Sequence, residues 1–266
     1  MLPAPEAYFS FSFTGIIWRI LPNEQGSVWI IEIRDKASPA VVFAAIDISK
    51  GFLQWEDDTL AITSWTTAVA LSGDVLLLQT YTQSTPPQVM ALTAVSINPK
   101  RQVWERPKAT FIQSGPEAVW VKETTFEKTV YLRLAIFTGA ELEKTAQPLA
   151  VHSPAPTTGS IQYPVSYAEG STYWNAVSGF LRSFLQVSPV NVVEYAETGH
   201  FIVISYYLYQ DGQYNNWLAV FDQSGKLQWQ EKIGSALPGT GNNTFLVTNN
   251  RLIFVKEKNQ VVGYVL

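Results

Sequence analysis

The chain has 266 residues, of which 47% are hydrophobic and 15% charged, so it has ample material for a large core and little for a disordered tail. Its net charge of −4 comes from 18 basic and 22 acidic residues that are scattered along the sequence. Without a cluster of Lys and Arg to neutralise phosphates, we expect no nucleic-acid partner. No run approaches the roughly 18 to 20 uncharged apolar residues that cross a bilayer, so we expect no membrane insertion.

The absence of cysteine excludes disulfide bonds, thiolate catalysis and thiolate metal sites. Met1 to Phe13 lacks the basic, apolar and small-residue regions of a secretory signal. Both observations favour a cytoplasmic protein. Aromatic residues make up 13% of the chain, a bias toward side chains that fit pleated surfaces. Composition therefore predicts one all-β domain over residues 1–266.

In chain order, strand-like runs alternate with turn signals, beginning with the alternating run Tyr8 to Phe13. Inner strands are expected to begin near Gly15, Thr67, Glu117, Val190 and Thr244. Second strands are expected at Ser27 to Ile33, Val75 to Tyr81, Thr129 to Phe137, Phe201 to Tyr209 and Leu252 to Lys256. Third strands are expected at Val41 to Ile48, Val89 to Ile97, Gln147 to Val151, Trp217 to Phe221 and Val261 to Leu266.

A degenerate repeat connects these runs. The stretch Ile46 to Trp55 has the pattern of a strand, a turn containing Gly and a second strand that ends in Trp. Val220 to Trp229 repeats it, with Gly four residues before Trp in both copies. Val95 to Trp104 keeps the Trp and has Lys100 in place of the Gly. The spacing of the first two tryptophans matches the roughly 40 to 50 residues of one propeller blade.

The last blade lacks one strand. Three strand-like runs follow Trp229, and the run Tyr8 to Phe13 is available as the fourth. We therefore predict a five-bladed β-propeller closed by pairing of its N- and C-terminal strands, which removes exposed sheet edges. The third blade is the least regular, because the Pro- and Thr-rich segment Ser153 to Gly159 interrupts any strand there.

One segment has helical periodicity. From Ser171 to Gln186, apolar residues recur at three- and four-residue spacing, with Ser171 as the N-cap and Pro189 beyond the end. Gly179 lies inside this segment and disfavours a helix. We predict a helical insertion over 171–186, between the third and fourth blades.

The Trp-bearing repeat resembles those of quinoprotein-like and other Trp-bearing propeller families. This resemblance implies that each Trp packs between neighbouring blades. No blade carries the full motif, and the metal ligands of quinone-binding members have no counterpart here, so we expect no cofactor. Residues 190–266 also look like an uncharacterised bacterial family of unknown function.

In a propeller, ligands sit on loops at the channel mouth, which places a set of charged and aromatic residues on one face. The candidate ligand-binding residues are Glu56, Asp57, Asp58, Arg106, Tyr173, Trp174, Asp211, Tyr214 and Trp217. The aromatic run from Tyr206 to Trp217 can stack on a sugar ring or a peptide, although packing between blades explains most of it. The two histidines fall in different blades, so we expect no metal site.

The acidic triplet Glu56, Asp57 and Asp58 has two interpretations. It can supply a carboxylate for acid and base chemistry on a glycoside, or it can be a solvated turn. We favour a non-catalytic binding or interaction module that uses one propeller face, with a protein, peptide or glycan as ligand. The alternative is a glycan-processing hydrolase of the five-bladed type, and a purely structural role is third. The hydrolase requires carboxylates that converge from different blades.

Overall fold

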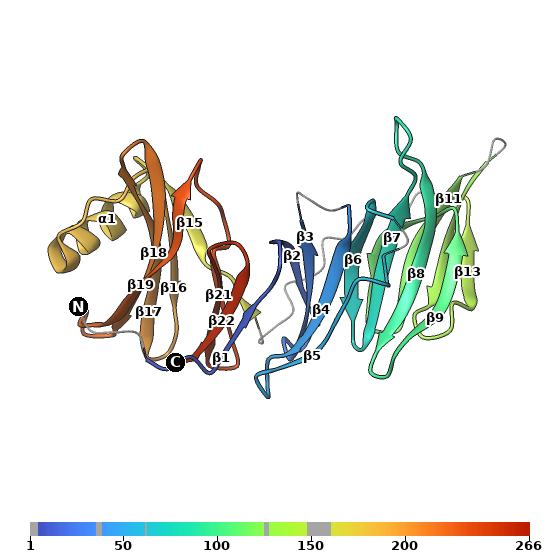
Figure 1. Ribbon diagram of the computed structural model, residues 1–266, viewed down its shortest axis with the longest axis horizontal. Coiled ribbons are helices and arrows are strands. Elements are labelled where there is room, and N and C mark those ends of the chain that lie inside the picture. The colour runs from blue at the N-terminus through green and yellow to red at the C-terminus, as the bar shows by residue number, and fades with distance from the viewer. Residues whose placement is uncertain (1–4, 36–38, 62, 125–127, 148–160) are drawn as a thin grey trace. The chain divides into compact units, whose positions relative to one another are not determined.

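The computed structural model describes residues 5–35, 39–61, 63–124, 128–147 and 161–266 (Figure 1). These residues form antiparallel sheets and one α-helix, so the predicted all-β class with one helix is confirmed. They divide into two compact units. The first unit is Thr14–Thr158, and the second combines Met1–Phe13 with Gly159–Leu266.

The first unit contains three sheets, each with its four strands in sequence order. The first sheet consists of β2 (Ile16–Pro22), β3 (Val28–Arg34), β4 (Val41–Asp47) and β5 (Phe52–Asp57). The second consists of β6 (Thr66–Ser72), β7 (Val75–Tyr81), β8 (Val89–Ile97) and β9 (Lys100–Pro107). The third consists of β10 (Ala109–Ser114), β11 (Ala118–Thr124), β12 (Thr129–Ala135) and β13 (Glu141–Thr145).

The second unit contains two sheets of five strands. The fourth sheet has the order β15 (Val165–Ala168), β16 (Val192–Glu197), β17 (Phe201–Gln210), β18 (Gln213–Asp222) and β19 (Leu227–Leu237). The fifth has the order β1 (Phe9–Ser12), β22 (Gln260–Val265), β21 (Arg251–Lys256), β20 (Phe245–Thr248) and β14 (Ile161–Gln162). Short edge strands, β15 and β14, extend both sheets beyond four strands.

The predicted pairing of the chain's first and last strands is confirmed. β1 runs antiparallel to β22, with Phe9 opposite Gly263 and Ser12 opposite Gln260. The Phe9 ring lies directly over Gly263, where a side chain would overlap it. A backbone bond from Phe13 N to Asn259 O, 2.8 Å long, continues the pairing beyond the strand. The edge of β22 is therefore covered by residues from the other end of the sequence.

The expected position of the tryptophans is also confirmed. Trp55, Trp104 and Trp229 lie in the last strands of the first, second and fourth sheets, each beside a register shift in its pairing with the preceding strand. Trp55 Nε1 donates to Ile97 O of the second sheet at 3.0 Å, and Trp104 Nε1 donates to Ile136 O next to β12 at 2.8 Å. The ring of Trp229 lies 4.8 Å from that of Tyr264 in the fifth sheet.

The turns before two of these tryptophans are built alike. Asp47 accepts hydrogen bonds from Ser49 Oγ and Lys50 N, and Asp222 accepts them from Ser224 and Lys226 N. Burial raises the pKa of Asp47, but the hydrogen bonds outweigh it and leave that pKa lowered. The Ser224 hydroxyl and the Lys226 amide lower the pKa of Asp222. The repeated Asp therefore fixes the turn that presents each Trp.

The prediction for the third sheet is wrong by one strand. Its inner strand is β10, and the strand expected to be innermost, from Glu117, is the second strand. The run Thr129 to Phe137 is consequently the third strand, and the expected third strand at Gln147 to Val151 falls largely outside the described residues. β9 and β10 are joined by the single residue Lys108 with φ of 59°, so no Gly, Asn or Asp turn separates them in the sequence.

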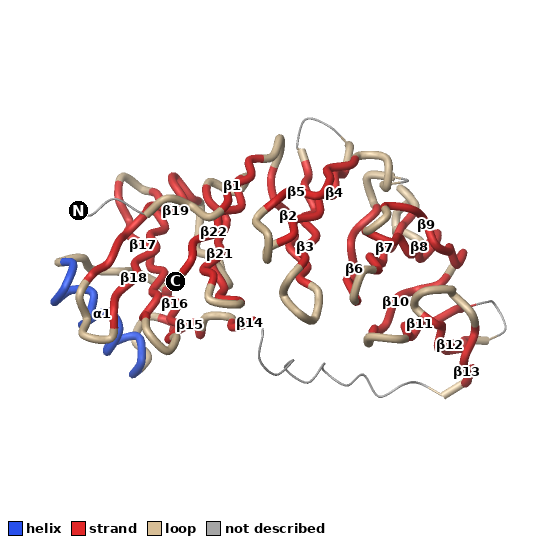
Figure 2. The backbone as a smooth tube through the Cα atoms, turned by 90° about the horizontal axis from the view of Figure 1, so that it is seen from below, coloured by secondary structure: helices blue, strands red, loops and turns tan. Residues whose placement is uncertain are grey.

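The helix α1 (Thr172–Leu185) begins after Ser171, whose hydroxyl accepts a bond from Trp174 N, as predicted. It differs from the prediction in its place, because it joins β15 to β16 within the fourth sheet instead of separating two sheets. Its buried residues Trp174 and Leu181 pack on one face of that sheet. Figure 2 shows the helix beside the strands of the fourth sheet. The opposite face of the fourth sheet packs on the fifth.

Buried polar side chains connect neighbouring sheets of the first unit. Glu32 in β3, which is fully buried, accepts bonds from Thr67 Oγ1 at 2.8 Å and Ala68 N at 3.0 Å in β6. Gln79 in β7 makes the next connection: its amide oxygen accepts from Phe111 N in β10 at 2.8 Å. A buried polar group without a partner costs free energy, roughly 1–3 kcal/mol for a neutral group and more for a charged one. Each of these two side chains therefore fixes the register of two neighbouring sheets.

The second unit has an equivalent connection. Glu194 in β16 is 1% exposed and accepts bonds from Thr244 N at 2.9 Å and from Thr244 Oγ1 at 2.5 Å, just before β20. The same carboxylate accepts from Ser166 Oγ in β15 at 3.0 Å. One buried carboxylate therefore holds the edge strand β15 and the fifth sheet to the fourth.

The pairing of the two ends can be tested by adding one methyl group. Gly263→Ala should lower the free energy of unfolding by about 1–3 kcal/mol, because the new carbon overlaps the buried Phe9 ring. Urea denaturation measures this loss. Gly239→Ala is the control, since nothing lies within 4 Å of a carbon added there, and it should cost no stability. Equal effects of the two substitutions would contradict the pairing.

Candidate functional site

The three members of the acidic triplet differ in their surroundings. Asp57 is 9% exposed, forms an ion pair with Lys100 of the second sheet, and accepts bonds from Thr59 N at 2.5 Å and Thr59 Oγ1 at 2.6 Å. Glu56 and Asp58 are exposed. The buried member of the triplet thus connects two sheets and holds the turn that follows β5.

Arg106 has a comparable role. Its guanidinium pairs with Glu123 of the third sheet at 2.6 Å and lies 3.7 Å from Glu141 on the same sheet. All three side chains are partly exposed. An arginine that bridges two sheets in this way has its charge compensated within the protein.

The carboxyl pKa values of Asp47 and Asp222 are both lowered. Both groups are held by the hydrogen bonds of the repeated turn. The hydrolase alternative calls for a carboxyl pKa raised by burial, so it gains no support from these groups.

The remaining candidates belong to the second unit, whereas the triplet and Arg106 belong to the first. Asp211 and Gly212, with φ of 52° and 80°, form the turn between β17 and β18. Close to this turn, the Tyr214 ring lies 4.8 Å from that of Tyr209, and its hydroxyl accepts a bond from Asn191 Nδ2 at 3.0 Å. Trp217 is half-buried against the apolar cluster under α1. These contacts join the end of the hairpin to the rest of the fourth sheet.

A cavity does form around Tyr173. It lies between α1 and the fourth sheet and has a volume of about 370 Å³. We call it the tyrosine groove; its lining residues are Tyr167, Tyr173, Ala176, Val177, Phe180, Tyr195, Ile202 and Ile204. Tyr173 is 66% exposed and stacks on Tyr167, with ring centroids 5.2 Å apart and planes 24° apart. The groove is thus lined mainly by apolar and aromatic side chains, of which Tyr173 is largely exposed.

One residue that lines the groove, Tyr195, carries a polar group. The Tyr195 hydroxyl donates to Glu197 Oε2 at 2.8 Å. Burial and this neighbouring carboxylate raise the pKa of Tyr195 to about 12, so the hydroxyl keeps its proton. Trp174, the candidate adjacent to Tyr173, points the other way: it is 9% exposed and belongs to the core beneath the helix.

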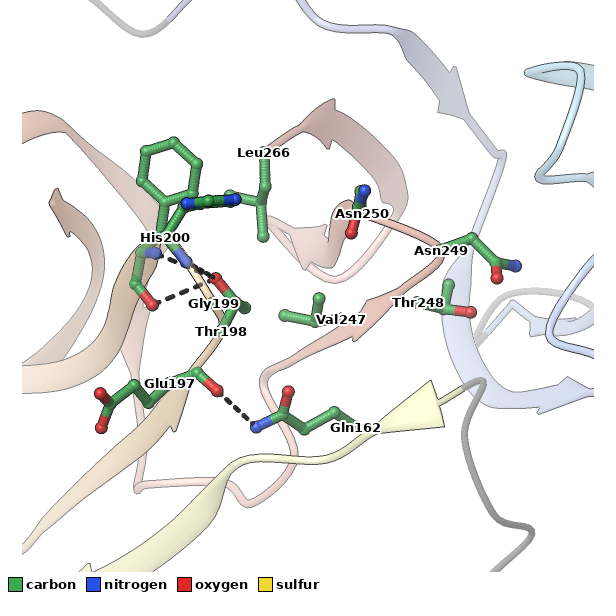
Figure 3. A pocket seen from close by; sticks show the side chains of 11 residues that line it. Gln162, Glu197, Thr198, Gly199, His200, Val247, Thr248, Asn249, Asn250 and Leu266 are labelled. Atoms are coloured by element: carbon green, nitrogen blue, oxygen red, sulfur yellow. Dashed lines mark hydrogen bonds between the residues drawn. The ribbon is translucent and has the colours of Figure 1, made fainter. Parts of the chain in front are cut away.

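A larger cavity of about 740 Å³ lies in the same unit, between the turns that follow β16 and β20 (Figure 3). Its polar groups bind one another: Gln162 Nε2 donates to Glu197 O at 3.0 Å, and Thr198 Oγ1 accepts from Phe201 N at 3.0 Å. Figure 3 shows the Glu197 carboxylate directed away from this space. The turn residue His200 lines this cavity and is exposed.

The sequence predicted Tyr173 but not its partners in the groove. Tyr167 and Tyr195 lie on two neighbouring strands, β15 and β16, and come together with the helix only through the sheet pairing. The alternation of β16 is visible in the sequence, whereas β15 has only four residues and offered no signal. In the described ranges, no group of three or more His, Cys, Asp or Glu is placed to hold a metal ion.

Comparisons with known proteins bear on the fold. A family profile described as "Domain of unknown function (DUF4905)" matches residues 23–104, and no curated protein matches the chain. The profile falls on the first two sheets. It does not include residues 190–266, the segment for which the sequence predicted a likeness to a family of unknown function. Among the described residues, no helix has the length and apolar character to span a membrane.

Solved structures similar to the chain include β-propellers. BamB from Moraxella catarrhalis has 14% identity and a TM-score of 0.35, with 93% of this chain and 84% of that chain covered. The β-propeller domain of the Trilobed protease from Pyrococcus furiosus has 8% identity and a TM-score of 0.35, with 91% and 65% covered. A glycosyl hydrolase from Bacteroides ovatus has 9% identity and a TM-score of 0.30, with 96% and 85% covered.

The chain is therefore an all-β protein of antiparallel sheets, and a profile for a domain of unknown function matches part of it. At these identities, nothing about activity follows from the similar structures.

The structural role of Asp57 can be measured. Asp57→Asn should lower the free energy of unfolding by about 1–2 kcal/mol, because it removes the charge that pairs with Lys100, a group one-third exposed. Asp58→Asn, the control at an exposed neighbour, should stay within about 0.5 kcal/mol of the wild type. A double-mutant cycle with Lys100→Met gives the coupling energy, and a coupling of zero would contradict the pairing.

Proposed function

We propose that this protein is a non-catalytic binding module whose tyrosine groove receives an apolar or aromatic side chain of a protein or peptide partner. The observation that carries the proposal is the mouth of the groove. There Tyr173 stands two-thirds exposed on Tyr167, although a large ring normally gains by burial.

The groove has the properties of a prepared binding site. Its volume of about 370 Å³ falls in the range of small-ligand sites, roughly 300–1,000 Å³. Its walls come from a capped helix and a sheet, so little conformational freedom is lost on binding. Tyrosine side chains offer large contact areas with only two rotatable bonds. The Tyr195 hydroxyl provides one polar contact that can orient the bound group.

Filling the groove should abolish binding. Peptides selected from a displayed random library on the wild-type protein should carry aromatic or large apolar residues. They should bind Ala176→Trp at least about tenfold more weakly, because the indole occupies the groove. Affinities are measured by isothermal titration calorimetry.

The matched control is Asn175→Trp, the same added ring at the neighbouring exposed helix position, which does not line the groove. It should bind the selected peptides as the wild type does. Selected peptides that bind Ala176→Trp as tightly as the wild type would refute the groove as the site.

We also propose that the five sheets are the blades of one propeller domain, residues 1–266. Every sheet is antiparallel, and β1 completes a sheet whose other strands come from the C-terminal part of the chain. The unit that contains β1 therefore needs both ends of the sequence.

A single domain unfolds cooperatively, so calorimetry should give one transition whose calorimetric and van't Hoff enthalpies agree. Gly263→Ala should move that whole transition to lower temperature. Two separate transitions, of which only one responds to Gly263→Ala, would contradict the single-domain proposal.

A further inference from the structure

Trp18 is an exposed indole that the sheet itself directs outward. It is 65% exposed, the highest value among the described tryptophans. In the pairing of β2 with β3, Ile17 lies opposite Ile33 and Arg19 opposite Glu32, so Trp18 is the extra residue of a β-bulge. Bulges re-aim a side chain and are frequent next to functional sites. An exposed apolar ring placed by a bulge calls for a functional explanation.

The ring of Trp18 has a rigid support. The guanidinium of Arg34 lies 5.8 Å from the ring centroid. Its Nε donates to Glu32 Oε1 at 2.7 Å, and its two terminal nitrogens donate to Ser64 O and Thr66 O, each at 2.8 Å. These bonds fix the guanidinium in one place, and the cation attracts the face of the indole. Trp18 is thereby held while much of its surface stays in solvent.

A second exposed indole belongs to the segment that binds Arg34. Trp65 is 46% exposed and lies between the two residues whose carbonyls bind Arg34. The polar groups beside it carry no charge: Thr63 Oγ1 accepts from Trp65 N at 3.1 Å, and Gln83 Nε2 approaches Ser64 Oγ at 3.5 Å. We call Trp18, Arg34 and Trp65 the tryptophan platform.

We propose that the tryptophan platform binds a neutral carbohydrate. A sugar ring offers a face of C–H groups that packs on an indole, and hydroxyls that match the uncharged hydroxyl and amide groups of Thr63, Ser64 and Gln83. The positive charge of Arg34 is compensated by Glu32, with which it forms a 2.7 Å ion pair, so the platform does not select for anions. The ligand class is distinct from that of the tyrosine groove, which is lined mainly by apolar and aromatic side chains.

The experiment uses the full chain with cellohexaose, maltohexaose and the hexamer of N-acetylglucosamine as probes, and adenosine as a non-sugar aromatic probe. Isothermal titration calorimetry and saturation-transfer NMR should detect binding of at least one hexasaccharide. Trp18→Ala should weaken that binding about tenfold, and Trp18→Tyr should retain most of it because a ring remains.

Two controls separate the possible causes of a loss. Phe137→Ala removes another exposed ring, 55% exposed in the same unit, and should leave sugar binding unchanged. Ala176→Trp should also leave it unchanged, so that this test stands whether or not the tyrosine groove binds peptides. The proposal is overturned if none of the three hexasaccharides binds, if adenosine alone binds, or if Trp18→Ala and Phe137→Ala weaken binding equally. Far-UV circular dichroism verifies that each variant is folded.

Discussion

The structure depends on buried polar side chains that one sheet sends to the backbone of the next. An antiparallel sheet packs through non-directional apolar contacts, and these alone allow neighbouring sheets to slide. Glu32, Gln79 and Glu194 remove that freedom, because each would be buried without a partner if the next sheet moved. The indole N–H groups of Trp55 and Trp104 act in the same way.

Both proposed binding surfaces are extensions of these connections. Glu32 holds the second sheet and also fixes Arg34, which supports the ring of Trp18. Glu194 holds the fifth sheet and also binds Ser166, the neighbour of Tyr167 in the edge strand of the tyrosine groove. Aromatic rings can therefore remain exposed in fixed orientations, because the groups behind them are rigid parts of the fold. Charged residues that looked available for chemistry, such as Asp57 and Arg106, are instead used in contacts between sheets.

Sequence reasoning predicted part of the two proposed binding surfaces and missed the rest for identifiable reasons. Tyr173 was a candidate because it belongs to the helical segment that the periodicity predicts, and Ser171 marked where that helix begins. Trp18 was missed because a bulge breaks the alternation that otherwise tells inside from outside. Asp57 was taken for a solvated or catalytic carboxylate because its partner, Lys100, belongs to another sheet. Pairings of this kind leave no local trace in the chain.

The sequence by itself determined the strand order of four sheets apart from the short edge strands β14 and β15, the helix with its cap, and the joining of the two ends through β1 and β22. These features follow from local periodicity, turn chemistry and the count of strands after the last repeated Trp. Only the tertiary structure decided which face of the fourth sheet α1 covers, where the third sheet begins, and which exposed rings have rigid support. The reason is physical: local patterns record whether a residue prefers burial, whereas the neighbour that satisfies it is set by contacts between residues far apart in the chain.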